Sequence, residues 1–140
     1  MTENTKEIIK STIPFIKENK DDITKNMYKI LFEKYPQTKE LFKDSTADQP
    51  KKLVNAIYAY ANNLDKLDTL TKGIETMVNA HVKTNIQPEH YPMVQDALLS
   101  SIKQTLGDQC TSEIIKAWSD AYEFLANILI AKERVAYSKY

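Results

Sequence analysis

Glycine, cysteine and histidine are scarce in this sequence, and each scarcity excludes a class of chemistry. The 140 residues contain two glycines, too few for a dinucleotide-binding fingerprint, a phosphate-binding loop or a nucleophile elbow. The single cysteine, Cys110, excludes disulfides, thiolate zinc sites and redox pairs within the chain. The two histidines, His81 and His90, form no metalloprotease motif, and neither has the glutamate spacing of di-iron bundles. The remaining chemistry must use few residues or come from a cofactor.

An excess of charge of one sign and long apolar runs are also missing. Nineteen Lys and Arg residues balance nineteen Asp and Glu residues, so the composition does not favour nucleic acid or an anionic membrane as a partner. The longest apolar stretch, residues 124–131, is far shorter than the roughly 18 residues that span a bilayer. The N-terminus lacks a signal-peptide pattern. We therefore expect a cytoplasmic protein with a single domain over residues 1–140.

The apolar residues recur at helical spacing, and we find no sustained alternation of the kind that indicates strands. The predicted helix faces lie at residues 9–16, 27–35, 53–64, 74–82, 94–106 and 114–129. We expect Asp21 and Asp22 to cap the second helix and Pro36 to end it. We expect Gly107 to end the helix whose apolar face covers residues 94–106, and Thr111 to cap the last helix. The prediction is an all-α fold of six to seven helices of unequal length, packed at ridge-into-groove crossings.

His81 is the first candidate functional residue, because it lies on the same predicted helix face as Met77. A lone inward histidine is usually a buried neutral imidazole bonded to a carbonyl or hydroxyl, and the alternative is an axial ligand of a metal cofactor. Tyr28, Phe42 and Gln49 precede it, and each taken alone is explained as core, as a staple or as a solvated first-turn residue. Together and in this order, they form a pattern.

That pattern resembles the globins, and within them the flavohaemoglobin branch with its single-domain bacterial members. The matching stretches are colinear from about residue 5 to the end of the chain: Tyr28 to Phe32, Pro36 to Phe42, Gln49 to Leu53, His81, His90 to Val94, Leu106 to Asp108, Ala117-Trp118, Ala121-Tyr122, and Glu133 with Tyr137. The resemblance implies a globin fold, in which six to seven helices sandwich a haem.

The resemblance further implies haem b as cofactor and His81 as the proximal ligand of its iron. Tyr28 and Gln49 become distal hydrogen-bond donors, and Glu133 pairs with His81 beside Tyr91. The remaining haem contacts that it implies are an aromatic wedge, three apolar walls and a propionate partner: Phe42, Leu53, Met77, Val94 and Lys52. A carboxylate that accepts the second N–H of an iron-bound imidazole makes that ring more electron-rich, which favours oxygen activation over storage.

The resemblance implies a haem protein that binds dioxygen, nitric oxide and carbon monoxide. The first hypothesis is enzymatic: nitric oxide and dioxygen give nitrate at the haem, and a separate reductase restores ferrous iron. The second is a reversible oxygen carrier or scavenger. A haem-based sensor and a helical adaptor without haem rank below these two. The oligomeric state, monomer or homodimer, stays open.

Overall fold

The computed structural model describes residues 2–42 and 58–138. Its helices are α1 (Glu3–Glu18), α2 (Lys20–Lys34), α4 (Thr71–Thr84), α5 (His90–Leu106) and α6 (Ser112–Tyr137), with the short 3-10 helices η1 (Pro36–Phe42), η2 (Leu67–Leu70) and η3 (Gly107–Gln109). Residues 58–62 are helical as well. Neither of the two described ranges contains a strand, which confirms the all-α prediction.

Side-chain caps start two of the helices. Thr2 accepts a hydrogen bond from the Thr5 amide at 3.1 Å, and Thr111 accepts one from the Ile114 amide at 3.2 Å, so the predicted cap of the last helix is confirmed. The prediction that Asp21 and Asp22 cap the second helix is wrong. That helix begins at Lys20, and both carboxylates lie inside its first turn, where they face the positive end of the helix dipole.

Proline and left-handed residues end the helices where the sequence indicates. Helix α2 stops at Lys34, two residues before Pro36, as predicted. Gly107 follows α5 with a positive φ of 58°, which also confirms its predicted place at the end of that helix. Asn85, with φ 66° and ψ 37°, terminates α4 in the left-handed conformation. This turn lies four residues after the candidate histidine, His81.

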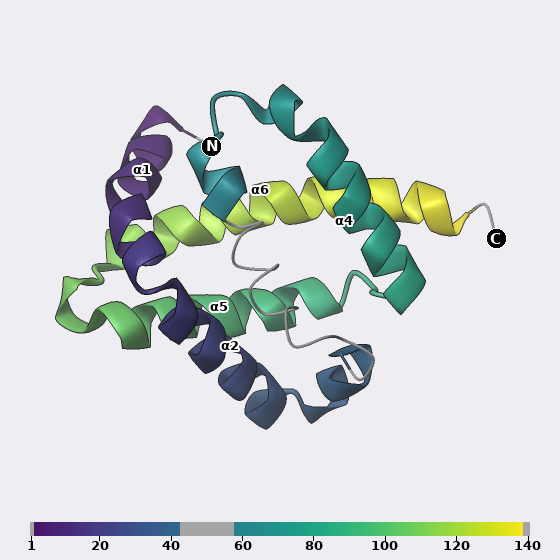
Figure 1. Ribbon diagram of the computed structural model, residues 1–140, viewed down its shortest axis with the longest axis horizontal. Coiled ribbons are helices and arrows are strands. Elements are labelled where there is room, and N and C mark those ends of the chain that lie inside the picture. Colours follow the sequence, from purple (N-terminus) through teal and green to yellow (C-terminus); the bar gives the residue numbers. More distant parts are fainter. Residues whose placement is uncertain (1, 43–57, 139–140) are drawn as a thin grey trace.

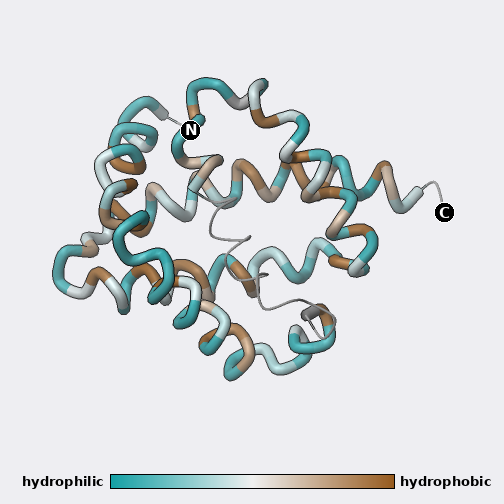
Figure 2. Tube along the Cα trace, in the orientation of Figure 1, coloured by the Kyte–Doolittle hydropathy of each residue, from teal (hydrophilic) through white to brown (hydrophobic). Residues whose placement is uncertain are grey.

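The long helices α5 and α6 form the centre of the arrangement (Figure 1). Helix α2 crosses and packs on α5, whereas α4 crosses and packs on α6, and α1 packs on the first half of α6. Hydrophobic residues recur at intervals along each helix instead of forming one long run (Figure 2). Among the described helices, none is both long enough and apolar enough to cross a membrane.

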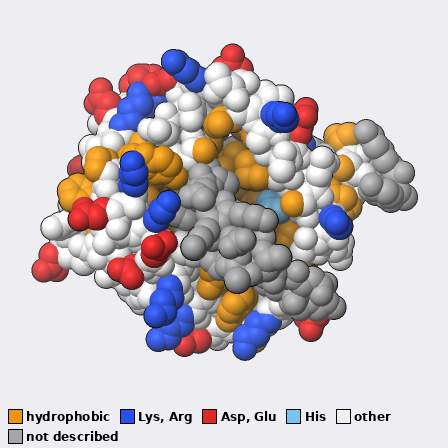
Figure 3. Space-filling model, viewed as in Figure 1, with side chains coloured by type: hydrophobic (Ala, Val, Ile, Leu, Met, Phe, Trp, Pro, Cys, Tyr) orange, Lys and Arg blue, Asp and Glu red, His pale blue; other side chains and the backbone are white. Residues whose placement is uncertain are grey.

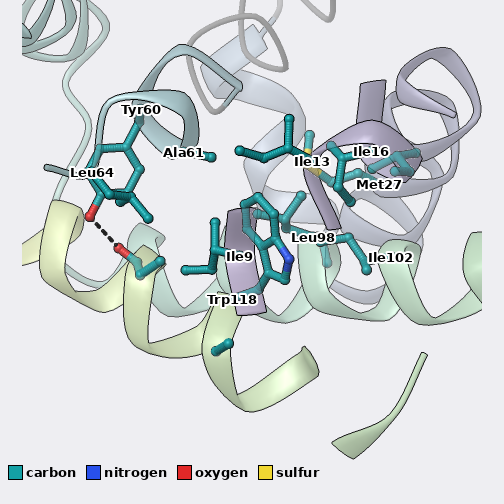
Figure 4. Close-up of a cluster of buried hydrophobic side chains, with 14 of the residues drawn as sticks. Ile9, Ile13, Ile16, Met27, Tyr60, Ala61, Leu64, Leu98, Ile102 and Trp118 are labelled. Carbon is teal, nitrogen blue, oxygen red and sulfur yellow. Dashed lines mark hydrogen bonds between the residues drawn. The ribbon is translucent and has the colours of Figure 1, made fainter. Parts of the chain in front are cut away.

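The main core joins α1, α2, α5, α6 and the segment around residue 60. Its buried hydrophobic members are Ile9, Ile13, Ile16, Ile23, Met27, Leu31, Tyr60, Ala61, Leu64, Ala97, Leu98, Ile102, Ala117, Trp118 and Ala121. Two polar groups in it are satisfied. The Trp118 indole donates to Thr12 Oγ1 at 2.9 Å, and the Tyr60 hydroxyl donates to the Ala121 carbonyl at 3.0 Å (Figure 4).

A second, smaller cluster packs α4 against α6 and the start of α5. Its buried residues are Ile74, Val78, Tyr91, Ala126 and Leu129. Leu70, Tyr122 and Leu125 contact both clusters, so α4 is tied to the main core through these three side chains. The second cluster carries the candidate site.

Candidate functional site

His81, Tyr91 and Glu133 meet where α4, α5 and α6 converge. Glu133 Oε2 lies 3.0 Å from His81 Nδ1, and the Tyr91 hydroxyl donates to the two Glu133 oxygens at 2.7 and 2.8 Å. The same hydroxyl lies 3.0 Å from His81 Nδ1. A carboxylate is an acceptor only, so Nδ1 of His81 carries the proton and donates it to Glu133. The tautomer of the histidine is therefore fixed by its neighbours.

Glu133 is buried, although its sequence neighbours Lys132 and Arg134 are exposed. Only 3% of the residue is accessible, and a buried carboxylate requires donors to offset its lost hydration. Tyr91 and His81 supply them. Burial, together with the hydrogen bond to Glu133, raises the pKa of the Tyr91 phenol, so the phenol stays protonated and keeps donating at neutral pH.

Two further tyrosines from α6 hold the backbone around this cluster. The Tyr122 hydroxyl donates to the Tyr91 carbonyl at 2.9 Å. The Tyr137 hydroxyl donates to the Ile86 carbonyl at 2.6 Å and lies 3.4 Å from the His81 carbonyl. Sequence reasoning assigned neither tyrosine a function. A usable signal existed for Tyr137, because it follows Glu133 by four residues and so shares its helix face.

The other side of the His81 ring has a different environment. Within the part of the chain that the structure describes, Nε2 makes no hydrogen bond, and 31% of the side chain is accessible. Met77, one turn earlier on α4, is a half-buried apolar neighbour in the second cluster. Figure 3 shows hydrophobic side chains gathered in the central part of one face, with a histidine side chain among them. Among the described residues, the ring thus has one nitrogen anchored and the other without a hydrogen-bond partner.

Tyr28 and Val94 come from the α2–α5 side of the molecule, where both are half-buried against the main core. The Tyr28 hydroxyl is buried, and its ring lies 5.7 Å from that of Phe32. Burial raises the pKa of Tyr28 to about 12. Tyr28 is therefore a neutral phenol at physiological pH, able to donate a proton in a hydrogen bond.

Several predicted site residues fall outside the described part of the chain. These are Gln49, Lys52 and Leu53, and also the side chain of Phe42, whose backbone ends η1.

The described residues also form a shallow depression of about 320 Å³ on the surface of α4 and α6, lined by Glu75, Val78, Asn79 and Lys132. Of the predicted site residues that the structure describes, none lines it. His90, to which no role was assigned, accepts a hydrogen bond from the Gln87 amide at 2.9 Å.

Comparison with known proteins decides the family. The globin family model matches residues 25–129. The chain belongs to the globin family. A globin-like protein of Aquifex aeolicus is 48% identical over 99% of both chains. A flavohemoprotein of Oceanobacillus iheyensis is 42% identical over 99% of this globin, which spans about a third (35%) of that longer protein.

Solved structures agree with this assignment. An engineered carbene transferase, derived from a putative nitric oxide dioxygenase of Rhodothermus marinus, has a TM-score of 0.94 and 35% identity, covering 99% of this globin and 96% of that chain. A bacterial globin from Campylobacter jejuni has a TM-score of 0.88 and 34% identity, and the match covers 98% of this globin and 99% of that chain. The predicted globin fold and its relation to flavohaemoglobins are confirmed.

Haem b is the cofactor of this globin, as its family indicates. The described residues fit such a group. His81 offers an imidazole whose Nδ1 is held by a buried carboxylate and whose Nε2 has no hydrogen bond in the described structure, the arrangement typical of metal-ligating histidines. Half-buried apolar side chains such as Met77 and Val94 suit a flat hydrophobic cofactor, and Tyr28 adds a buried phenol.

Proposed function

We propose that this globin binds dioxygen and nitric oxide and combines them to nitrate, with electrons from a separate reductase. The observation that carries the proposal is the buried Glu133 carboxylate against His81 Nδ1 at 3.0 Å, reinforced by Tyr91. When bound, haem supplies an iron centre with an open coordination position for a diatomic gas. The name of the R. marinus relative, a putative nitric oxide dioxygenase, supports this proposal.

On the proximal side, we assign Nε2 of His81 as the protein ligand of the iron. Glu133 accepts the Nδ1 proton, so electron density in the ring rises, and Tyr91 keeps the carboxylate oriented. A histidine ligand made electron-rich in this way would favour oxygen activation, whereas one that donates to a neutral carbonyl would favour simple storage. The Glu133–His81 pair therefore supports an activating role for this globin.

On the distal side, we assign Tyr28 as the principal donor to the bound gas and Gln49 as the second. A phenol with a pKa of about 12 stays protonated at neutral pH, and its hydrogen bond to a partly charged oxygen is worth about 1.5–3 kcal/mol. The cofactor contacts in this proposal are a wedge, apolar walls and a propionate partner: Phe42, Leu53, Met77, Val94 and Lys52.

The proposed reaction balances as one nitric oxide, one dioxygen and one electron giving one nitrate ion. Two new N–O bonds form, the O–O bond breaks, and a flavin- or nicotinamide-dependent reductase supplies the electron. The test mixes the haem-loaded, reduced and air-equilibrated protein with nitric oxide in a stopped-flow instrument. We expect stoichiometric nitrate and ferric haem within the mixing time, followed by recovery when a reductase is added. Ferric haem forming no faster than with free haem in solution would overturn the proposal.

A second candidate is reversible oxygen binding for delivery or scavenging. It is favoured by the full-length matches to the A. aeolicus and C. jejuni globins, which are similar to this chain over 99% of their own lengths. The oxygen dissociation rate and the autoxidation rate separate the two candidates. Slow autoxidation over hours, together with slow nitrate formation, supports the carrier, whereas rapid autoxidation contradicts it.

A further inference from the structure

Helix α6 reaches α4 from two successive turns. Glu133 contacts the ring of His81 through Nδ1, and Tyr137, four residues later on the same face, contacts the backbone that follows His81. The phenol has one proton, and the 2.6 Å bond to the Ile86 carbonyl takes it; the His81 carbonyl lies farther away at 3.4 Å. The same helix thus contacts the His81 side chain and the backbone turn that follows His81.

The backbone of His81 depends on the turn that Tyr137 holds. The Ile86 amide donates to the His81 carbonyl at 2.9 Å, across the left-handed residue Asn85, so that Ile86 and His81 belong to one closed turn. Lys83, Thr84 and Asn85 are exposed. The fully buried residues of α4 in the second cluster, Ile74 and Val78, lie one to two turns earlier, and the half-buried Val82 and Ile86 pack against the same cluster. The Tyr137 hydroxyl adds a directional tertiary hydrogen bond at the end of the helix that carries His81.

We propose that Tyr137 is a positioning residue, which fixes the position and direction of the His81 imidazole by anchoring the last turn of α4. The proposal rests on haem binding and on His81 as iron ligand, but not on nitrate formation. A ring held only at Nδ1 can pivot about that atom. Fixing its Cα as well defines the direction of Nε2, and a metal ligand needs support of this kind to be held to a fraction of an ångström.

The test compares Tyr137→Phe with Tyr60→Phe in the haem-loaded protein. Both variants delete one phenol that donates to a backbone carbonyl, but Tyr60 bonds to Ala121 in the main core, away from α4. Two readouts are taken: amide hydrogen exchange at Ile86, and the iron–histidine stretching band in the resonance Raman spectrum of the ferrous, gas-free protein. Neither readout depends on nitric oxide or oxygen, so a failed dioxygenase assay leaves this test intact.

We expect Tyr137→Phe to speed exchange at Ile86 by about three- to tenfold, the effect of one lost hydrogen bond, and to lower and broaden the iron–histidine band. Tyr60→Phe is expected to leave both readouts at their wild-type values, even where it lowers the melting temperature. An unmoved Raman band in Tyr137→Phe would overturn the proposal and leave Tyr137 a simple loop anchor. The same band shift in Tyr60→Phe would overturn it too, because general loosening would then be the cause.

Discussion

Replacing Glu133 with glutamine tests the proximal carboxylate directly, because the shape is kept and the charge is removed. The wild-type carboxylate accepts from Tyr91 at 2.7 and 2.8 Å and from His81 Nδ1 at 3.0 Å. A hydrogen bond to a charged group contributes about 1.5–3 kcal/mol, and one between neutral groups about 0.5–1.5 kcal/mol. The His81 bond therefore weakens by about 1–1.5 kcal/mol.

The weaker hydrogen bond destabilises ferric haem more than ferrous haem, because the ferric state benefits most from an electron-rich imidazole. For a one-electron couple, about 1.4 kcal/mol corresponds to about 59 mV, so the reduction potential of the haem should rise by about 40–60 mV. The free energy of unfolding of the haem-free protein should fall by less than the weakening of the His81 bond, since a neutral amide costs less to bury than a carboxylate.

The assay is a spectroelectrochemical titration of wild type, Glu133→Gln and the control Glu123→Gln. Glu123 lies on the same helix, but it is exposed, and within the described ranges it accepts one side-chain hydrogen bond, from Gln95 at 3.2 Å. The control should keep the wild-type potential. If Glu133→Gln also keeps it, the carboxylate does not tune the histidine, and the reasoning for oxygen activation is refuted.

Four further outcomes are expected. His81→Ala should lose haem on gel filtration, whereas the control His90→Ala should keep it; equal haem content in both variants would contradict iron ligation by His81. Tyr28→Phe should keep haem but release oxygen about tenfold faster in a stopped-flow assay, from the loss of one hydrogen bond to a partly charged acceptor; an unchanged rate would indicate another donor. A further prediction concerns stability. The pKa of Tyr28 is about 12 in the folded protein and about 10 in the unfolded chain, so the unfolded chain loses the phenol proton first. The contribution of Tyr28 to the free energy of unfolding is therefore full below pH 10 and is lost as pH rises toward 12. Urea unfolding at pH about 9 and about 11 should show that loss, and it should be smaller in Tyr28→Phe. Trp118→Phe should cost about 1–3 kcal/mol in urea unfolding, since it shrinks a buried side chain and removes the donor to Thr12 Oγ1, which keeps its own bond to the Ile9 carbonyl; a smaller loss would show that the lost bond and the indole packing contribute little.

Local signals in the sequence were sufficient for most of the described fold. The apolar spacing, Pro36, Gly107 and Thr111 each act within a few residues, so helix type and several boundaries follow from them. The start of α2 was predicted wrongly. A pair of aspartates is favourable both as a cap and in a first turn, and the close connection from α1 through Asn19 decides between them.

The polar contacts of the site depended on tertiary information. Glu133 looks solvated between two basic residues, and its burial follows from the packing of α6 against α4 and α5. Only the family resemblance placed it beside His81. The spacing of Tyr137 from Glu133 indicates a shared helix face, but no sequence pattern identifies the distant backbone carbonyls to which Tyr137 and Tyr122 donate. The roles assigned to Gln49, Lys52 and Leu53 stay predictions.

The length of α6 couples distant parts of this globin. At 1.5 Å per residue, its 26 residues extend over roughly 39 Å. Near its beginning Trp118 is bonded to α1, and near its end Glu133 is bonded to the histidine of α4. Fraying at either terminus therefore breaks tertiary contacts as well as helix turns. We expect amides in the middle of α6 to exchange only through global opening, as the slowest in the molecule.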